Sequence, residues 1–397
     1  MSSDLYQEAL QQKDRLIAVR RDLHAHPELG FQEVRTAGIV ARELNALGLE
    51  VRTGVARTGV VGLLEGARPG PVTLLRFDMD ALPVEEQTGA AYASLTPGVM
   101  HACGHDGHVA VGLTVARMLS ARRDELRGSL KFVFQPAEEG LGGAEAVIAD
   151  GVLERPRVDR SLALHVWNEL LLGKVAIHAG PLMAGGEIFN ARLEGRGGHG
   201  ALPHQAVDPV LAAAQVTLAL QSIVSRNVSP LQAAVVSVTR IQAGEAFNVI
   251  PPAAELTGTI RTFEAETREL VLRRFGEIVR GVGEAMGCRV TLDIRPVTPA
   301  VINDAGSAQA LQEMARRDFP ELQIDTQFRT MVSEDMAYLL ERAPGVYFLV
   351  GAANPEKGLV YGHHHPKFDF DEDALIHAAA LMAAAALELQ HKDIDGK

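Results

Sequence analysis

The densest group of chemically active side chains in the sequence is the run from His101 to His108. It contains one thiol, three imidazoles and one carboxylate within eight residues. Thiolate and neutral imidazole are both good ligands for zinc and similar divalent ions. A lone buried cysteine near solvated histidines would usually be structural, but this density favours a metal site.

A pair of adjacent acids, Glu138 and Glu139, follows the apolar residues 132–134 and precedes Gly140. Adjacent acids often lie in a solvated turn, but here they come directly after a predicted strand. Neighbouring side chains diverge, so one carboxylate can bind a metal ion while the other acts as a general base toward water.

A histidine between glycines, such as His199, is about as often a turn residue without a chemical role as it is a functional residue. The candidate histidines outside the 101–108 run are His165, His199 and His364.

The elements that must position these residues alternate between strand and helix in the first part of the chain. We predict a helix at 4–24, strands at 60–64, 72–77 and 130–134, and a helix at 106–119. This alternation is typical of an α/β layer architecture. Asp80, Glu138 and His165 all fall at or just beyond the ends of predicted strands. Because sites in open α/β sheets form at the carboxyl ends of strands, we expect these residues to meet there.

A second, smaller unit is predicted from about residue 185. Its elements are strands at 187–193, 234–241, 255–263 and 289–294, with helices at 208–225 and 267–286. This order predicts an α+β unit of the split βαβ, ferredoxin-like type. The chain then returns to helix–strand patterns and ends in an Ala-rich helix at 373–389. We therefore predict an α/β catalytic domain of residues 1–184 and 296–397, with a mixed sheet flanked by helices and residues 185–295 inserted into it.

The composition narrows the class of protein. The 397 residues carry a net charge of -12, which disfavours nucleic acid or an anionic membrane surface as the main partner. Only two cysteines occur, far apart in the chain, and neither a signal peptide nor an apolar run of about 18 residues is visible. These features predict a reduced, soluble, cytoplasmic protein.

The motifs resemble the amidohydrolase group of dinuclear metallopeptidases, of aminoacylase type. This group includes hippurate hydrolase, indole-acetyl-amino-acid hydrolases, N-acetyl-diaminopimelate deacetylase and certain metallo-carboxypeptidases. The resemblance runs nearly end to end, through residues 21–29, 76–83, 101–108, 135–140, 195–204, 248–251, 333–335 and 364–368. It implies hydrolysis of the amide bond of N-acyl-L-amino acids, such as N-acetyl or hippurate-like N-benzoyl substrates. It also implies two divalent ions (zinc, manganese, nickel or cobalt) and a homodimer or homotetramer that associates through the inserted lid domain.

The same resemblance implies residue roles. The implied metal ligands are Cys103, His105, Glu139, His165 and His364. Glu138 would be the general base, and Asp80 would orient a ligand imidazole. His199 on the lid would stabilise the oxyanion, in its own or the partner's active site. Asn248 and Arg261 would hold the substrate carboxylate, for which an arginine is well shaped.

Two features limit how far these roles carry over. Met336 stands where the family has phenylalanine, which affects a pocket wall. Three consecutive histidines make the last ligand ambiguous by one residue, and we choose His364 because it lies two before Pro366. Five ligands cannot give two ions separate tetrahedral shells, so we expect one group, the Cys103 thiolate, to bridge.

Other classes of function stay open at this point. A metallo-carboxypeptidase or dipeptidase could use the same site. A metal-free hydrolase with Cys103 as nucleophile would leave Glu138, Glu139 and His165 unexplained. A non-enzymatic binding protein would need no base. A purely structural zinc site is usually closed by four protein ligands, whereas the added carboxylates favour an open one.

Overall fold

The computed structural model describes residues 2–391, which form two compact units. The larger unit comprises the residues up to Leu182, Ile302–Arg329 and the residues from Asp335 onward. The smaller unit comprises Met183–Val301 and Thr330–Glu334. Each unit has its own hydrophobic core. The strands β7 (Gly180–Met183) and β14 (Val301–Asn303) pair with each other where the chain passes between the units.

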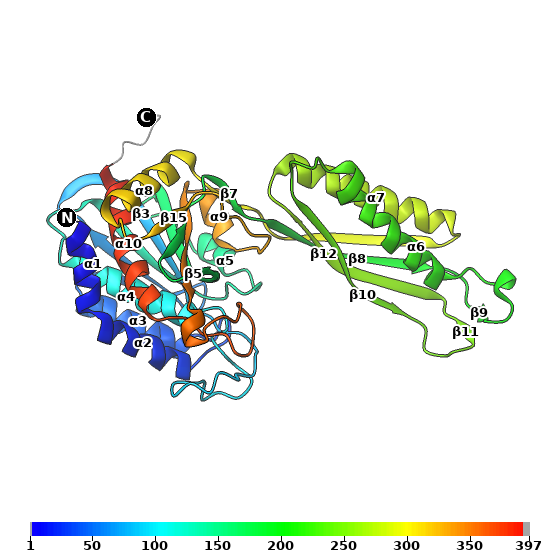
Figure 1. The fold of residues 1–397 in the computed structure, drawn as a ribbon, viewed down its shortest axis with the longest axis horizontal. Coiled ribbons are helices and arrows are strands. Elements are labelled where there is room, and N and C mark those ends of the chain that lie inside the picture. The colour runs from blue at the N-terminus through cyan, green and yellow to red at the C-terminus, as the bar shows by residue number, and fades with distance from the viewer. Residues whose placement is uncertain (1, 392–397) are drawn as a thin grey trace. The chain divides into compact units, whose positions relative to one another are not determined.

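An eight-stranded mixed sheet in the order β1-β2-β4-β3-β5-β16-β6-β15 forms the centre of the larger unit (Figure 1). The four central strands, β4, β3, β5 and β16, run parallel, whereas β1 and β2 are antiparallel additions at one edge. The strands are β1 (Glu50–Val55), β2 (Gly59–Glu65), β3 (Arg68–Asp78), β4 (Arg127–Gln135), β5 (Arg160–Leu171), β6 (Lys174–Ala176), β15 (Gln323–Asp325) and β16 (Gly345–Ala353).

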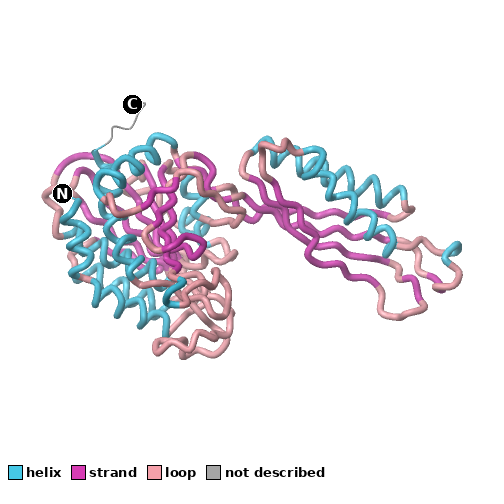
Figure 2. Tube along the Cα trace, viewed as in Figure 1, coloured by secondary structure: helices cyan, strands magenta, loops and turns pink. Residues whose placement is uncertain are grey.

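Helices cover both faces of this sheet (Figure 2), which explains why the central strands are almost continuously apolar. The helices are α1 (Ser2–Gln11), α2 (Lys13–Ala25), α3 (Val34–Ala46), α4 (His105–Ser120), α5 (Gly143–Ala149), α8 (Ala305–Asp318), α9 (Met336–Leu340) and α10 (Asp373–His391), with a 3-10 turn at Pro355–Lys357. Helix α4 packs on β3 so closely that a Cβ on Gly112 would lie 2.7 Å from the Phe77 ring. Helix α10 is long and apolar enough to cross a membrane, but 78% of its apolar window is buried, as in a core helix.

The smaller unit is an antiparallel sheet in the order β10-β12-β8-β13 with two helices packed on it. Strand β12 alternates between buried and half-buried residues, as expected for a sheet covered on one face. The elements are β8 (Gly185–Glu194), β9 (Gly198–His199), α6 (Pro209–Ser222), β10 (Ala234–Ala243), β11 (Val249–Ile250), β12 (Ala253–Thr262), α7 (Ala265–Ala285) and β13 (Arg289–Thr298), with short turns of helix at Pro203–Gln205 and Ile223–Asn227. The predicted fold class, a mixed α/β sheet flanked by helices plus a smaller α+β unit, is confirmed.

Two predicted helices differ in detail from the structure. The single helix predicted at 4–24 is two helices, α1 and α2, interrupted at Gln12. Helix α1 packs on α10, whereas α2 packs on α4, so the break lets each helix follow its own partner. The helix predicted at 208–225 ends at Ser222 and continues as one π-helical turn.

Candidate metal centre

The register of the parallel strands brings the predicted site residues to one edge of the larger unit. Asp78 at the end of β3 lies opposite Gln135 at the end of β4, so the segments that follow both strands begin side by side. His165 lies within β5, opposite Leu349 of β16. Gly104 has φ 88° and starts α4, and a Cβ there would lie 2.7 Å from the side chain of Val166. The chain can therefore turn sharply between Cys103 and His105.

Cys103 is common to two groups of side chains that could each hold a metal ion. In each group the potential ligand atoms lie within 4.8 Å of one another. A third group joins His105 to the two glutamates. The groups are Cys103–His105–His165, Cys103–Glu139–His364 and His105–Glu138–Glu139. The structure thus links all five predicted ligands through shared members of these groups, and the Cys103 thiol belongs to two of them.

Hydrogen bonds at Nδ1 orient two of the imidazoles. His105 Nδ1 lies 2.9 Å from the Asp80 carbonyl oxygen, and His165 Nδ1 lies 2.6 Å from the Val166 carbonyl oxygen. Because Nδ1 of each ring is occupied as a donor, Nε2 is the ring atom that can coordinate a metal ion. His165 Nε2 lies 3.4 Å from Cys103 Sγ. Such orientation of a ligand by a carbonyl behind it is typical of metal-binding histidines.

Two observations indicate that this set of donor atoms suits a divalent metal ion. Within residues 2–391, His105 Nε2 is buried and has no hydrogen-bond partner, which is costly unless something else binds it. The buried Glu139 Oε1 accepts no hydrogen bond from these residues either and has an ion-pair contact with His364 Nε2 at 3.3 Å. Burial lowers the pKa of His105, but Asp78 and Asp80 outweigh it and raise the pKa to about 10. The site therefore favours a positive charge. Burial, with His108 nearby, lowers the pKa of His165 well below its usual value, so that ring stays neutral and able to coordinate.

The Asp80 carboxylate does more than the sequence predicted. Its two oxygens accept hydrogen bonds from the backbone amides of Glu138 and Glu139, both at 3.0 Å. Its Oδ1 also lies 3.4 Å from His105 Nδ1, although the closer partner of that ring is the Asp80 carbonyl. Asp80 is thus placed to hold the segment that carries the proposed base as well as a ligand imidazole.

The three consecutive histidines have different surroundings. His364 Nε2 lies 3.3 Å from Glu139 Oε1, and His364 has φ 65°. His363 is turned away, with Nε2 at 2.9 Å from the Val166 carbonyl oxygen, and burial lowers its pKa to about 3. His365 stacks on Tyr361. This geometry supports His364 as the ligand of the three.

A supporting chain of polar residues was not predicted from the sequence. Arg76 donates to Asp78 Oδ2, while His108 Nδ1 lies 2.5 Å from Asp78 Oδ1. The Nε2 of His108 accepts from the backbone amide of Val166 at 3.0 Å, next to His165. The sequence spacing could have indicated this role, because His108 lies three residues after His105, and both lie on one face of the first turn of α4.

The lid candidates lie at two different places in the smaller unit. His199 pairs with Val249 between β9 and β11, and the Asn248 carbonyl accepts from Gly200 at 2.8 Å, so His199 and Asn248 are neighbours. Both are exposed. Arg261 lies near the other end of β12, eight residues beyond Ala253, which is about 26 Å at 3.3 Å per residue. The structure therefore brings two of these three residues together and keeps the third apart.

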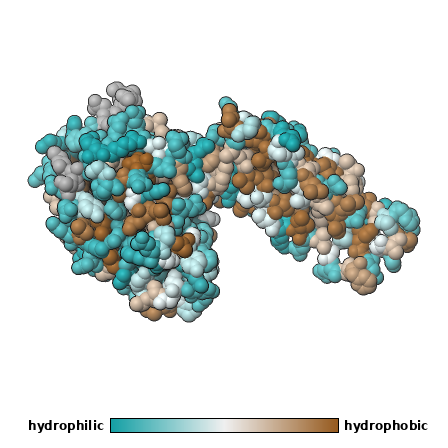
Figure 3. Space-filling model, in the orientation of Figure 1, coloured by the Kyte–Doolittle hydropathy of each residue, from teal (hydrophilic) through white to brown (hydrophobic). Residues whose placement is uncertain are grey.

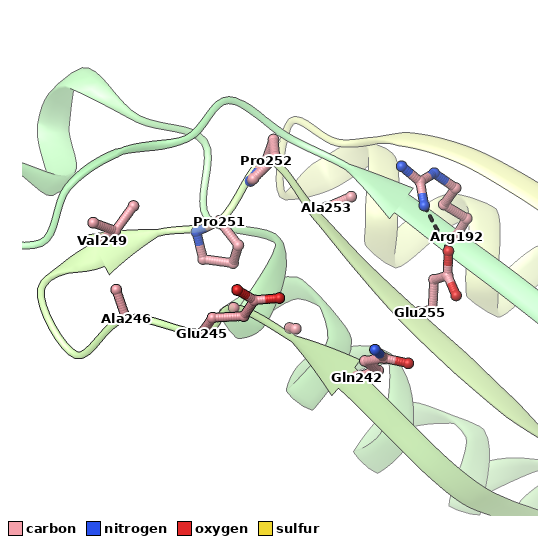
Figure 4. Close-up of a pocket in the computed structure, with 11 residues that line it drawn as sticks. Arg192, Gln242, Glu245, Ala246, Val249, Pro251, Pro252, Ala253 and Glu255 are labelled. Carbon is pink, nitrogen blue, oxygen red and sulfur yellow. Dashed lines mark hydrogen bonds and ion pairs between the residues drawn. The ribbon is translucent and has the colours of Figure 1, made fainter.

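The smaller unit also has a pocket beside the β10–β11 turn (Figure 4). It contains none of the predicted site residues. Two of its charged groups are engaged with each other, because Arg192 donates to Glu255 at 2.5 Å. The lining residues are Arg192, Gln242, Ala243, Gly244, Glu245, Ala246, Val249, Pro251, Pro252, Ala253 and Glu255.

Comparison with known proteins decides the family. Residues 74–388 match the family described as Peptidase family M20/M25/M40. The chain belongs to this family. It is 40% identical over 375 residues to N-acetylcysteine deacetylase of Bacillus subtilis, covering 94% of this chain and 96% of that relative. It is 37% identical over 386 residues to thermostable carboxypeptidase 1 of Saccharolobus solfataricus, covering 96% of each.

A solved structure supports the same assignment. The YXEP protein of Bacillus subtilis, described as a dinuclear metal binding peptidase from the M20 family, superposes with a TM-score of 0.84. It is 36% identical, and the match covers 96% of this chain and 99% of that one. The resemblance inferred from the motifs is confirmed, and this member of the M20 family is a metal-dependent hydrolase of amide bonds.

Proposed function

We propose that this M20 enzyme hydrolyses the amide bond of N-acyl-L-amino acids with two divalent ions bound by Cys103, His105, Glu139, His165 and His364. The observation that carries the proposal is the convergence of these five side chains, with Cys103 shared between two ligand groups and with Glu138 in a group with His105 and Glu139. The similarity to N-acetylcysteine deacetylase and to a dinuclear peptidase supports it. Thiolate and imidazole favour zinc, while manganese, nickel and cobalt suit the same ligands.

The residues of the chain divide the chemistry between them. When bound, the ions would polarise the scissile carbonyl and lower the pKa of a nearby water. Glu138 takes the proton of the attacking water and returns it to the leaving nitrogen. His199 donates a hydrogen bond to the developing oxyanion, and removal of one such donor typically lowers kcat 10²–10³-fold. Asn248 binds the free carboxylate of the substrate.

The separation of Arg261 from His199 supports an active site shared between subunits. A small substrate cannot contact both ends of a strand about 26 Å long. If both residues bind substrate, they must serve two different active sites. We therefore propose that His199 and Asn248 act on the partner's substrate. Coexpression of Glu138→Gln and His199→Ala subunits tests this, because mixed dimers should regain activity at one site. No recovery in verified mixed dimers would contradict it.

The proposed assembly is a homodimer or homotetramer through the smaller unit. Among the described residues, β10 pairs with a strand on one side only, and α6 exposes Val210, Leu211 and Leu218. Apolar residues are visible on the surface of the unit that carries α6 and α7 (Figure 3). An open edge strand beside an apolar helix face is a surface that proteins normally cover.

We also propose a cytoplasmic location. Cys103 and Cys288 are both free and buried. A reducing compartment such as the cytoplasm keeps thiols free of disulfides, and a free thiol can be deprotonated to bind metal.

A second candidate activity is that of a metallo-carboxypeptidase, supported by the 37% identity to thermostable carboxypeptidase 1. Both substrate classes present an amide next to a free carboxylate, so the same residues would bind either. A hydrolysis screen of N-acetyl-, N-benzoyl- and indole-acetyl-amino acids and of dipeptides, with metal analysis of the same sample, decides between them. Turnover of dipeptides alone would overturn the N-acyl-amino-acid proposal.

Metal removal separates the proposal from a cysteine hydrolase. We expect a chelator to abolish turnover and two equivalents of zinc, manganese, nickel or cobalt to restore it. Full activity of the verified metal-free protein would overturn the metal proposal and favour Cys103 as nucleophile.

A further inference from the structure

The segment that carries Glu138 and Glu139 is held by carboxylates through three successive backbone amides. Ala137 donates to Glu33 Oε1 at 2.9 Å, and the next two amides donate to Asp80. The Ala137 carbonyl accepts from Gly143 at 3.0 Å. Both polar backbone groups of Ala137 are therefore engaged.

Ala137 has a backbone conformation that needs support. Its φ of 57° lies in the left-handed region, which a residue with a Cβ seldom adopts, and the residue is fully buried. Strained residues of this kind persist only where the surroundings fix them. The peptide that follows Ala137 sets the directions in which Glu138 and Glu139 diverge.

Glu33 has the contacts that such a support requires. It is fully buried at the start of α3, and its Oε2 accepts from Thr58 Oγ1, so each carboxylate oxygen has one donor. Two glycines also let neighbouring segments of backbone pass close to Pro136 and Ala137. A Cβ on Gly30 would lie 3.1 Å from the Ala137 Cα, and a Cβ on Gly59 would lie 3.0 Å from the Pro136 ring.

We propose that Glu33 is a positioning residue for Glu138, acting through the Ala137 peptide. It does not belong to any of the ligand groups around Cys103. Without its Oε1, the buried Ala137 amide loses its acceptor and the φ of Ala137 is free to relax. Glu138 then leaves its place beside the reacting water, while Asp80 still holds Glu139. The proposal rests on the proposed role of Glu138 as general base.

Four variants test this. Glu33→Met removes the carboxylate that accepts from the Ala137 amide. Glu33→Asp shortens the side chain by one methylene and so moves the carboxylate away from that amide. Glu33→Gln keeps an oxygen for Ala137. Thr58→Val is the matched control, because it removes the other hydrogen bond of Glu33 and leaves the Ala137 bond intact.

We expect Glu33→Met and Glu33→Asp to lower kcat about 10–100-fold, since small misplacements of a catalytic group cost this much. KM should stay within about threefold, since substrate binding groups are untouched. Glu33→Gln and Thr58→Val should stay within about threefold of the parent enzyme. Bound metal per subunit, measured by elemental analysis, should not change.

Two further measurements distinguish positioning from mere stability. Hydrogen exchange of peptides covering 134–143 should accelerate in Glu33→Met and not in Thr58→Val, since only the former frees the Ala137 amide. In a Glu138→Gln background, Glu33→Met should change the residual kcat by no more than about twofold, because residues that act together are not additive.

Each outcome is decisive. Unchanged kcat in correctly folded, metal-loaded Glu33→Met and Glu33→Asp would overturn the proposal, and so would an equal loss in the Glu138→Gln background. Loss of metal would show that Glu33 supports the ligand Glu139 instead. If Glu138→Gln alone keeps full turnover, the proposed function is wrong, which is distinguishable from a failure of Glu33 alone.

Discussion

Glu138 and Glu139 are adjacent in the chain, yet the proposed mechanism gives their carboxylates different tasks. Glu139 Oε1 is buried beside His364 Nε2, at 3.3 Å, among donors that could hold an ion. Glu138 shares one group with His105 and Glu139 and another with Glu334 and Asp335, but none with Cys103. The residue identities alone could not assign these roles, because either acid could bind metal until the backbone direction is known.

Substitution of Glu138 and substitution of Glu139 should therefore affect turnover and metal binding differently. We expect Glu138→Gln to keep both metal ions and to lose about 10²–10⁴-fold in kcat, since it removes only a general base. Glu139→Gln should lower metal affinity, since it removes a charged ligand. Elemental analysis and steady-state kinetics on the same samples check this. Retained metal with unchanged turnover in Glu138→Gln would rule out the assigned base.

At the scale of elements, a buried polar cluster joins α2 to the first turn of α4 and to the segment that follows His364. Arg20 donates to Asp106 at 2.8 Å and to Asp369 at 2.8 Å, and its guanidinium lies between the rings of Tyr92 and Phe370. Asp106 follows His105 at the start of α4, and Asp369 follows the His364 loop. The cluster thus attaches to one helix, α2, the two segments that carry the proposed ligands His105 and His364.

The His24–Asp106 pair in this cluster makes stability depend on pH. His24 Nδ1 lies 2.8 Å from Asp106 Oδ2. Burial lowers the pKa of His24, but Asp106 and Glu86 outweigh it and raise the pKa to about 9. Because the folded pKa exceeds the unfolded value of about 6.5, the stabilisation is full below pH 6.5 and is lost as pH rises through 9.

Chemical unfolding of the wild type and His24→Gln from pH 6 to 10 measures this effect. We expect the variant to be less stable by about 1.5–3 kcal/mol below pH 6.5, the range for a hydrogen bond to a charged group. The difference should shrink toward pH 9. A difference that does not vary with pH would show that His24 is not charged in the folded protein.

The close contact between α4 and β3 gives a second prediction at this scale. A Cβ on Gly112 would lie 2.7 Å from Phe77 and 2.8 Å from Phe134, so we expect Gly112→Ala to cost about 1–3 kcal/mol of unfolding free energy. Gly38 on α3 has no atom within 4 Å of the added Cβ. Gly38→Ala should therefore stabilise the protein by about 0.4–1 kcal/mol. Denaturant titration of both variants checks the contrast.

These contacts show where prediction from the sequence stops. Hydrophobic period and strand ends were sufficient to predict the layers and the sheet edge to which Asp80, Glu138 and His165 belong. The support of Ala137 by Glu33 was not predictable, because it joins residues 104 positions apart through a backbone amide. Backbone hydrogen bonds to distant carboxylates leave no pattern in the order of residue types.

At the scale of the whole molecule, the proposed assembly depends on exposed apolar residues of α6. Leu218 is 68% exposed, although the helix is otherwise well packed on the sheet. A leucine of this exposure is ordinary alone, but here it accompanies other apolar residues and an open edge strand.

We expect Leu218→Asp to convert the oligomer to monomers, because a carboxylate in an apolar interface is strongly unfavourable. If His199 acts on the partner, the monomer should also lose turnover while it keeps its metal. Size-exclusion chromatography with light scattering checks the mass. Leu95→Asp, at a leucine 71% exposed in the larger unit, is the control for oligomeric state. An unchanged mass in Leu218→Asp would place the interface elsewhere.

The pairing of β7 with β14 has a consequence for the history of the chain. The two strands bring the points where the insertion starts and ends to adjacent positions. A short turn between them would close the larger unit without rerouting any strand of its eight-stranded sheet. Apart from the short segment Thr330–Glu334, the smaller unit is therefore one continuous stretch that a gene could gain, lose or exchange by recombination at two neighbouring sites, which would let substrate range diversify while the proposed metal ligands stay in place.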